Sequence, residues 1–194
     1  MTVITLSREM GSLGDEIALA VAARLNLRVV GRDLINHAAR QAGVPEVALA
    51  EIDELGLLGV KPSPEAFRLY HKTVSQTIHE LATTGDLLLV GRGGQMALAA
   101  NPAVLHVRVI APRDLRIQRV QESTHLPPEI AAARIDASDR VRADYLRRHY
   151  HTRLDYPGLY DLVLNTRHIS LETAVNLICQ AAQERAKCEP EEIA

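Results

Sequence analysis

Residues 4–17 read ITLSREMGSLGDEI, in which an apolar segment is followed by a turn that contains glycine and then by the start of an amphipathic helix. This order is typical of a phosphate-binding loop placed between a buried strand and a helix. Gly11 and Gly14 would allow backbone amides to approach phosphate oxygens without interference from a Cβ atom. The positive end of the helix dipole would then favour an anion. We therefore expect residues 4–17 to bind phosphate groups.

The same loop lacks two groups of the common nucleotide-binding pattern G-x-x-x-x-G-K-[ST]. In that pattern the Lys reaches the β- and γ-phosphates, and the Ser or Thr hydroxyl holds Mg²⁺. Residues 4–17 contain no Lys, and neither Ser nor Thr follows Gly14 within them. A function in nucleotide binding therefore has to tolerate the loss of both groups.

Length and composition favour one soluble domain. The chain has 194 residues, 47% of them hydrophobic, with a formal net charge of −2, so we expect a single α/β domain over 1–194. The weak net charge disfavours nucleic acid as a partner. The two cysteines, Cys179 and Cys188, lack the spacing of metal ligands and are expected to be reduced thiols. Neither a signal-peptide pattern nor an uninterrupted apolar run of about 18 residues occurs, which predicts a cytoplasmic protein without a membrane segment.

Apolar runs of strand length alternate with helical periodicity along the chain. We expect strands over 3–6, 27–30, 86–90, 104–110 and 161–165, and helices over 16–25, from 34 onward, 46–58, 65–84, 114–121, 128–149 and 172–186. Asp33 and Ser170 are expected to cap the helices that follow them. Strands that alternate with helices through parallel connections predict a doubly wound α/β sheet, in which ligands bind at the carboxyl ends of the strands.

Three predicted loops carry residues suited to a ligand. Gly11, Asp33 and Arg92 each follow a predicted strand. Because the carboxyl ends of parallel strands meet at one edge of a sheet, these residues are expected to lie at the same edge. Arg92 stands in the sequence GRGG, residues 91–94, at the end of the most apolar strand. Packing alone does not explain three glycines around one arginine, and we expect Arg92 to contact a ligand.

Several segments resemble the cytidylate kinase-like family. They are residues 4–14, 31–35, 90–93, 138–142, and 161–166 together with 170–172. The resemblance covers nearly the whole chain and implies a P-loop nucleoside monophosphate kinase fold, a three-layer α/β/α sandwich with a sheet of about five mostly parallel strands. It also implies three regions: a phosphate-loop unit over 1–30, a helical acceptor-binding insertion over 33–84 and an arginine-rich helical lid over 123–157.

The implied activity is ATP-dependent phosphoryl transfer to a nucleoside monophosphate such as CMP, with ATP and Mg²⁺ as cofactors. Phosphoryl transfer needs alignment of the reactants and neutralisation of phosphate charge, and guanidinium groups suit phosphate oxygens. The resemblance implies a donor-phosphate site of Arg8, Gly11, Ser12, Leu13, Gly14, Asp15 and Glu16, an acceptor site of Asp33, Arg92, Arg116 and Arg119, and catalytic roles for Arg92, Arg140 and Arg142. Small-molecule nucleotides are therefore the expected partners.

The chain departs from the family at the phosphate loop. Gly14 occupies the position of the usual Lys, Glu16 that of the hydroxyl, and Asp15 the place where related proteins often carry a basic residue. Two carboxylates at the start of a helix repel a triphosphate unless Mg²⁺ or an arginine intervenes. One compensation is that Glu16 binds Mg²⁺ directly and Arg8 replaces the Lys. The other interpretation is a catalytically weak or inactive relative that senses a nucleotide or acts as a scaffold.

The arginines between residues 114 and 153 also have a structural interpretation. Each of them alone could pair with Asp136, Asp139 or Asp144 on a solvated surface, whereas the set as a whole favours phosphate binding. A third interpretation, RNA or DNA binding through this region, predicts a steep dependence of affinity on salt concentration. The helix expected over 65–84 belongs either to the acceptor-binding region or to a homodimer interface, and the sequence leaves both open.

Overall fold

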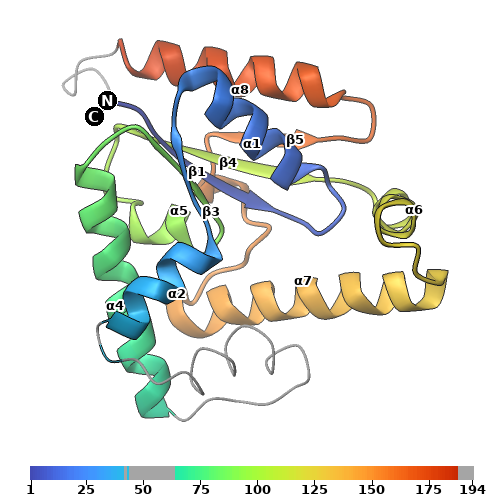
Figure 1. Cartoon of the computed structure of the whole chain (residues 1–194), viewed down its shortest axis with the longest axis horizontal. Coiled ribbons are helices and arrows are strands. Elements are labelled where there is room, and N and C mark those ends of the chain that lie inside the picture. Colours follow the sequence, from blue (N-terminus) through green and yellow to red (C-terminus); the bar gives the residue numbers. More distant parts are fainter. Residues whose placement is uncertain (42, 44–63, 188–194) are drawn as a thin grey trace.

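The structure, a computed structural model, describes residues 1–41, 43 and 64–187. Its strands are β1 (Val3–Arg8), β2 (Arg28–Val30), β3 (Leu87–Val90), β4 (Val104–Ile110) and β5 (Leu162–Asn165). Its helices are α1 (Gly14–Leu25), α2 (Arg32–Gln41), α4 (Pro64–Thr83), α5 (Gly94–Ala97), α6 (Arg113–Thr124), α7 (Pro128–Tyr150), the 3₁₀ turn η2 (Pro157–Leu159) and α8 (Leu171–Arg185). Figure 1 shows the sheet between two helical layers, with α1 and α8 on one side and α2, α4 and α7 on the other.

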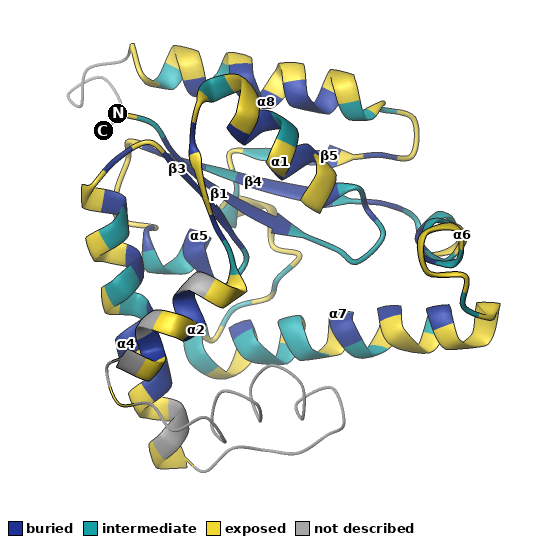
Figure 2. Ribbon diagram, viewed as in Figure 1, coloured by how far each residue is buried: buried dark blue, intermediate teal, exposed yellow. Residues whose placement is uncertain are grey.

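The five strands form one sheet in the order β2-β3-β1-β4-β5. All four neighbouring pairs are parallel, which is stricter than the mostly parallel sheet expected from the sequence. The central strand β1 lies between β3 and β4 and is buried along most of its length (Figure 2). The predicted doubly wound, three-layer α/β/α sandwich is thus confirmed.

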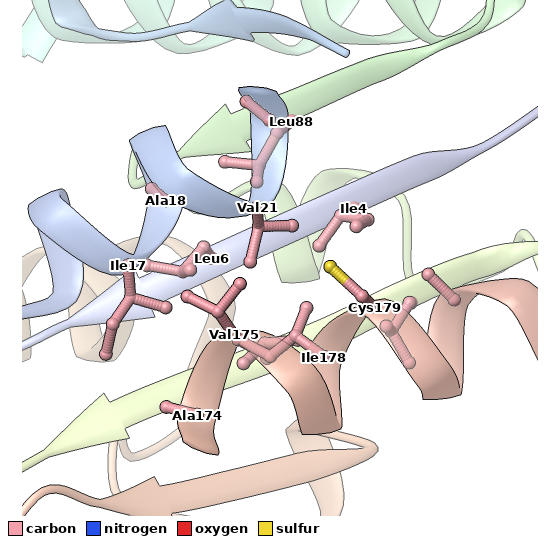
Figure 3. Close-up of a cluster of buried hydrophobic side chains, with 14 of the residues drawn as sticks. Ile4, Leu6, Ile17, Ala18, Val21, Leu88, Ala174, Val175, Ile178 and Cys179 are labelled. Atoms are coloured by element: carbon pink, nitrogen blue, oxygen red, sulfur yellow. The ribbon is translucent and has the colours of Figure 1, made fainter. Parts of the chain in front are cut away.

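Strand β3 separates two hydrophobic cores. All four of its residues are buried. Leu88 and Val90 join the core between the sheet and helices α1 and α8, which Figure 3 shows in close-up. Leu87 and Leu89 join the core beneath α2 and α4. Because successive side chains on a strand point to opposite faces, a strand covered by helices on both sides has to be apolar throughout. This packing fixes the carboxyl ends of the central strands, where the candidate site lies.

The start of α2 differs from the expectation. The helix begins at Arg32, so that Asp33 lies in its first turn instead of preceding it as a cap. The amide of Ile35 donates to Gly31 O at 3.3 Å, which places Gly31 at the cap position. A glycine there has no side chain to accept a hydrogen bond from the helix, and Asp33 in the first turn still favours the positive end of the dipole.

The cap predicted for the last helix is present in the structure. The Ser170 hydroxyl accepts a hydrogen bond from the amide of Thr173 at 3.1 Å and caps α8 as predicted. Cys179 is a free, buried thiol, whereas Cys188 and the helix expected over 46–58 lie outside the described residues. No helix within the described ranges is long and apolar enough to cross a membrane.

Helix α7 forms most of the region that the sequence assigned to a lid. It spans 23 residues, and its buried positions are Ala131, Ile135, Ser138 and Leu146. Their spacing places them on one side of the helix, which therefore faces the protein. The N-terminal half of α7 packs against α6. The role of α7 as a lid stays a prediction.

Candidate functional site

The segment between β1 and α1 has the backbone geometry of an anion-binding loop. Gly11 has φ +76°, and a Cβ on it would lie 2.7 Å from the backbone oxygen of Arg116, so a larger residue does not fit. Leu13 is also left-handed, with φ 65°. The first helical bond is donated by Ile17 N to Leu13 O at 2.9 Å. The amides between these two residues therefore have no partner within the helix and form the positive end of its dipole.

Side chains from elements that are distant in the sequence hold this loop through hydrogen bonds to its carbonyl oxygens. Ser12 is fully buried, and its hydroxyl donates to Glu9 O at 2.8 Å. The hydroxyl of Thr166, which follows β5, donates to Ser12 O at 3.0 Å. Arg119 on α6 donates to Gly11 O at 3.3 Å and to Thr166 Oγ1 at 2.9 Å. These bonds engage carbonyl oxygens of the loop and fix its path.

Arg116, also on α6, joins the loop to α7. Its side chain is only 6% exposed and donates to Met10 O at 3.3 Å and to Ala111 O at 3.1 Å. Two further bonds, of 3.2 and 2.8 Å, reach the carboxylate of Asp139 on α7. The sequence assigned Arg116 and Arg119 to the acceptor site, whereas the structure places both against the phosphate loop, where they support its backbone.

Two charged residues that the sequence analysis missed complete this framework. The Glu9 carboxylate accepts a hydrogen bond from Ala111 N at 3.1 Å and lies 3.4 Å from Arg108 Nη2. Arg108 lies in β4, is 7% exposed, and also donates to Ser7 Oγ at 3.2 Å. A signal for Arg108 was present, because an arginine inside the apolar run of a central strand needs a buried polar partner. Glu9 lies in a loop and carried no comparable signal.

Arg8 ends β1 and reaches over the start of α1. Its Nε donates to the Asp15 carboxylate at 2.9 Å. The Arg8 side chain is 22% exposed and that of Asp15 is 67% exposed, so this ion pair lies where the site opens to solvent. The neighbouring Glu16 is exposed as well. The structure thus brings three residues of the predicted donor site together at the first turn of α1.

A cavity of about 290 Å³ lies between the end of β1 and α7. Most of the residues that line it are charged; the full set is Arg8, Glu9, Arg108, Asp139, Arg142, Ala143, Arg147, Thr152, Arg153, Leu154 and Asp155. They come from the end of β1 and the loop after it, from β4, from α7 and from the segment that follows α7. This is the carboxyl edge of the sheet, at which a doubly wound fold binds its ligands.

Arg142 shows what kind of ligand the cavity suits. Its Nη1 donates to Ser138 Oγ at 2.6 Å, and no carboxylate of the described chain lies within salt-bridge distance of it. Burial, and then the repulsion from nearby Arg8, lower the pKa of Arg142 to about 10. Arg108 adds to this repulsion. An anion in the cavity would relieve the repulsion among the three guanidinium groups.

Arg92 is oriented by the helices of the predicted acceptor-binding region. It has a left-handed φ of +55°. Its Nη2 donates to Asn36 Oδ1 at 3.3 Å, and its guanidinium carbon lies 5.9 Å from the centre of the Tyr70 ring, within the range of a cation–π interaction. Asn36 on α2 and Tyr70 on α4 are both buried. The guanidinium is therefore held at the end of β3 by two helices.

Aromatic rings from α4 and α7 gather near the end of β3. The His71 ring lies 5.2 Å from the rings of His149 and Tyr150, and the Tyr145 ring lies 5.1 Å from that of His149. A Cβ on Gly93 would lie 3.1 Å from the Tyr145 ring. Burial raises the pKa of Tyr145 well above its ordinary value, and burial followed by His71 lowers the pKa of His149 to about 4. The C-terminal end of α7 is thus packed on α4 through uncharged rings.

Two residues of the predicted site lie apart from these groups. The Asp33 side chain is 97% exposed, with a carboxylate oxygen 3.6 Å from Arg32 Nε. Arg140 is exposed on α7 and is not among the residues that line the cavity. The roles assigned to Asp33 and Arg140 stay predictions.

The acidic residues at the start of α1 are compatible with Mg²⁺. In the part of the chain that the structure describes, no three His, Cys, Asp or Glu side chains are grouped as a metal site. Mg²⁺ in phosphoryl-transfer sites is usually held by one or two carboxylates together with substrate phosphates, so a cage made of protein alone is not required. Exposed carboxylates at Asp15 and Glu16, beside the anion-binding loop, meet that requirement.

The sequence pattern of the cytidylate kinase-like family matches residues 3–168, which is most of the chain. The chain belongs to this family. The matched region includes the phosphate loop, the end of β3 and the whole of α7.

Two relatives of this chain differ in length. A cytidylate kinase from Staphylothermus marinus is 25% identical over 179 residues, which cover 92% of this chain and 94% of that protein. A uronate isomerase from Corynebacterium glutamicum is 24% identical over 149 residues, which cover 77% of this chain and 28% of that protein. The chain therefore spans less than a third of the uronate isomerase that it matches.

Solved structures share the fold. An uncharacterised protein from Eubacterium ventriosum is 18% identical with a TM-score of 0.75, over 94% of this chain and 99% of that one. Shikimate kinase from Acinetobacter baumannii is 18% identical with a TM-score of 0.53, over 97% of this chain and 96% of that one. The fold is that of the P-loop kinases, and together with the family it supports a kinase-type phosphoryl transfer.

Proposed function

We propose that this member of the cytidylate kinase-like family catalyses ATP-dependent phosphoryl transfer to a nucleoside monophosphate, with CMP as the first acceptor to test. The observation that carries the proposal is the position of Arg142. It lines the cavity together with Arg8 and Arg108, and no carboxylate of the described chain pairs with it. Guanidinium groups gathered in this way suit phosphate oxygens, which can bind them in pairs and neutralise them.

The donor phosphates are assigned to the loop after β1. Gly11, Ser12, Leu13 and Gly14 lead into the N-terminus of α1, where the amides of residues 14–16 have no partner within the helix. Phosphate binding needs a loop backbone with a fixed conformation. Arg116 and Arg119 hold this backbone through hydrogen bonds to its carbonyl oxygens. We therefore assign both arginines to positioning of the donor site.

The acceptor is assigned to the end of β3. Arg92 is held there by Asn36 and Tyr70, and we assign its guanidinium to the acceptor phosphate. Asp33 is exposed at the start of α2 and is available to orient the rest of the acceptor. On α7, the cavity-lining Arg142 rather than the exposed Arg140 is the residue that we assign to the reacting phosphate.

The reaction needs little covalent help from the protein. An oxygen of the acceptor phosphate attacks the γ-phosphorus, the bond from the γ-phosphorus to the β–γ bridging oxygen breaks, and ADP leaves. No side chain has to remove a proton, because the attacking oxygen already belongs to an anion. Mg²⁺ would neutralise charge on the donor phosphates, and we assign Asp15 and Glu16 as the carboxylates that would hold it.

The proposal is tested by following ADP release and product formation from ATP with CMP, UMP, AMP and GMP in turn. We expect CMP to be converted to CDP by the native protein. Arg142→Ala should lower the rate by about 10²–10³-fold, the effect of removing one preorganised charge-stabilising donor. Arg134→Ala removes an exposed arginine of the same helix that does not line the cavity and should leave the rate unchanged. Absence of transfer to every nucleotide, or full activity of Arg142→Ala, would contradict the proposal.

A second candidate function is nucleotide sensing or scaffolding by a catalytically weak or inactive relative. It is favoured by the two carboxylates in the first turn of α1, Asp15 and Glu16, which stand beside the place of the donor phosphates. This function predicts that the native protein binds ATP but transfers no phosphoryl group above the rate without protein. The acceptor screen therefore distinguishes the two functions.

A further inference from the structure

The phosphate loop of this chain has two positions of the usual pattern exchanged, the one that holds a cation and one that holds a glycine. When Gly14 is placed at the Lys of G-x-x-x-x-G-K-[ST], the second glycine of the pattern falls on Leu13 and the first on Arg8. The hydroxyl then falls on Asp15, one residue before the Glu16 that the resemblance implied. Leu13 has φ 65°, in the left-handed region that glycine enters most readily. Leu13 therefore has the backbone conformation that glycine favours, although neither glycine position of the pattern holds a glycine.

The two exchanged positions exclude each other's side chains. A Cβ on Gly14 would lie 2.4 Å from Arg8 Cβ and 2.8 Å from Arg8 Cγ, which is closer than nonbonded carbon atoms approach. A lysine at position 14 is therefore compatible only with glycine at position 8, and that is the combination in the pattern. This chain has the reverse combination, a cation at position 8 and glycine at position 14.

We propose that Arg8 supplies, from the end of β1, the cation that the pattern's lysine supplies from the start of α1. This inference rests on the proposed function and names the residue that contacts the transferred phosphoryl group. A Cβ on Gly91 would lie 2.6 Å from Arg8 Nη1, so the side chain extends from the start of α1 to the end of β3. Gly91 directly precedes Arg92. Arg8 therefore lies between the donor loop and the acceptor site.

Asp15 holds the Arg8 guanidinium in this place through the 2.9 Å bond to Arg8 Nε. Because the Asp15 side chain is 67% exposed, solvent weakens the ion pair. A phosphate oxygen can therefore replace the carboxylate as the acceptor of the Arg8 hydrogen bond. The released carboxylate then stands at the position where the pattern's hydroxyl holds Mg²⁺.

Arg8 takes no part in the covalent change. As the acceptor oxygen bonds to the γ-phosphorus and the bond to the bridging oxygen breaks, the guanidinium donates hydrogen bonds to γ-phosphoryl oxygens and neither gains nor loses a proton. Its contribution is to neutralise charge at the point of transfer, which is the main requirement of this reaction.

A side-chain exchange tests the inference. Native protein, Arg8→Gly, Gly14→Lys and the double variant Arg8→Gly/Gly14→Lys are compared by calorimetric titration with ATP and Mg²⁺ and by transfer to CMP. Each single variant should lose affinity for ATP, and its rate should fall by about 10²–10³-fold. The double variant restores the combination of the pattern, so it should regain most of the lost affinity and rate. Arg134→Ala again serves as the control for loss of an arginine outside the cavity.

A smaller substitution at position 14 tests the same contact with less risk of unfolding the protein. Gly14→Ala removes no charge, but its Cβ displaces the Arg8 side chain, so it should lower ATP affinity and the unfolding temperature in the native background. In the Arg8→Gly background the same substitution meets neither Arg8 contact, and only the contact with Ser12 Oγ at 3.3 Å remains. ATP affinity and the unfolding temperature should then fall much less than in the native background, because alanine also suits a helix better than glycine does. The dependence of this effect on the residue at position 8 can be measured without following phosphoryl transfer.

The outcomes separate the inference from the proposed function. If the exchange restores ATP affinity but no acceptor is phosphorylated, the proposed function fails and the role of Arg8 stands. The role of Arg8 is overturned if Arg8→Gly binds ATP as the native protein does, or if the double variant is impaired by the sum of the two single effects. It is also overturned if the native protein binds neither ATP nor tripolyphosphate, since Arg8 then has no phosphate to contact.

Discussion

Arg116 Nη2 lies 2.8 Å from Asp139 Oδ2, and this contact ties α7 to the residues that hold the phosphate loop. The same guanidinium donates to Met10 O within the loop. A shift of α7 therefore reaches the backbone of the loop through one side chain. A second pair between α6 and α7, Arg113 with Asp136, is also bidentate, with distances of 2.9 and 2.7 Å, but it does not touch the loop.

Loss of the Asp139 carboxylate should destabilise the protein. Asp139→Asn leaves the buried Arg116 with Glu9 as its remaining carboxylate, at 3.4 Å. We expect the free energy of unfolding in urea to fall by roughly 1–3 kcal/mol, less than for a fully buried pair because solvent reaches the carboxylate. Asp136→Asn is the matched control, and the exposure of its pair, 48% and 47%, predicts a loss below about 1 kcal/mol. Equal losses in the two variants would contradict the buried role of Arg116.

The conformation of Gly11 should be essential to the loop. Gly11→Ala places a Cβ 2.7 Å from Arg116 O at a φ of +76°, and we expect it to lower stability by at least about 1 kcal/mol and to abolish ATP binding. Gly31→Ala is the control, because a Cβ there meets no atom within 4 Å. Thermal denaturation and ATP titration of both variants check the prediction, which fails if Gly11→Ala binds ATP normally.

Substitution of Arg92 should impair transfer to the acceptor and leave the affinity for the donor ATP unchanged. We expect Arg92→Ala to keep its fold and its ATP affinity while transfer to CMP falls by about 10²-fold or more. Asn36→Leu removes the oxygen that accepts from Arg92 Nη2 and should raise the KM for the acceptor more than it lowers kcat. Steady-state kinetics with each substrate varied in turn measure both effects. Unchanged transfer by Arg92→Ala would show that the acceptor binds elsewhere.

The ring cluster should make stability depend on pH. The pKa of His149 is lowered from 6.5 to about 4, by burial and then by His71, and burial lowers the pKa of His71 as well. The unfolded chain therefore binds more protons than the folded chain between these values, and stability should fall as the pH is lowered from about 6.5 to about 4. His149→Gln should flatten this dependence of the unfolding temperature, whereas substitution of the exposed His168 by Gln should not. A slope in His149→Gln equal to the native slope would count against the cluster as its origin.

The sequence was sufficient to predict the fold because its signals were local and mutually consistent. Four consecutive apolar residues at 87–90 predicted a central strand covered on both sides, and β3 has that position in the structure. The sequence predicts the start of α2 too late, because Asp33 favours a cap position whereas the helix begins earlier, after Gly31. The short helix α5 was not expected, since a helix of one turn leaves no periodic pattern.

The site was harder to predict because its contacts join residues that are far apart in the chain. Arg116 and Arg119 were recognised as functional, but only the structure places their guanidinium groups against the loop of residues 9–14. The loss of the usual lysine was evident from the sequence. The physical reason that we infer is that the Arg8 side chain leaves no room for a Cβ at position 14, a contact in space that no sequence pattern contains.

We expect the phosphate loop to bind a nucleoside triphosphate although it lacks the usual lysine. Calorimetric titration of the purified protein with ATP, in the presence and absence of Mg²⁺, tests this most directly. The cations around the cavity and the carboxylates of α1 predict micromolar binding that depends on Mg²⁺. Absence of binding at millimolar ATP would contradict the claim and would leave a kinase fold without a phosphate donor.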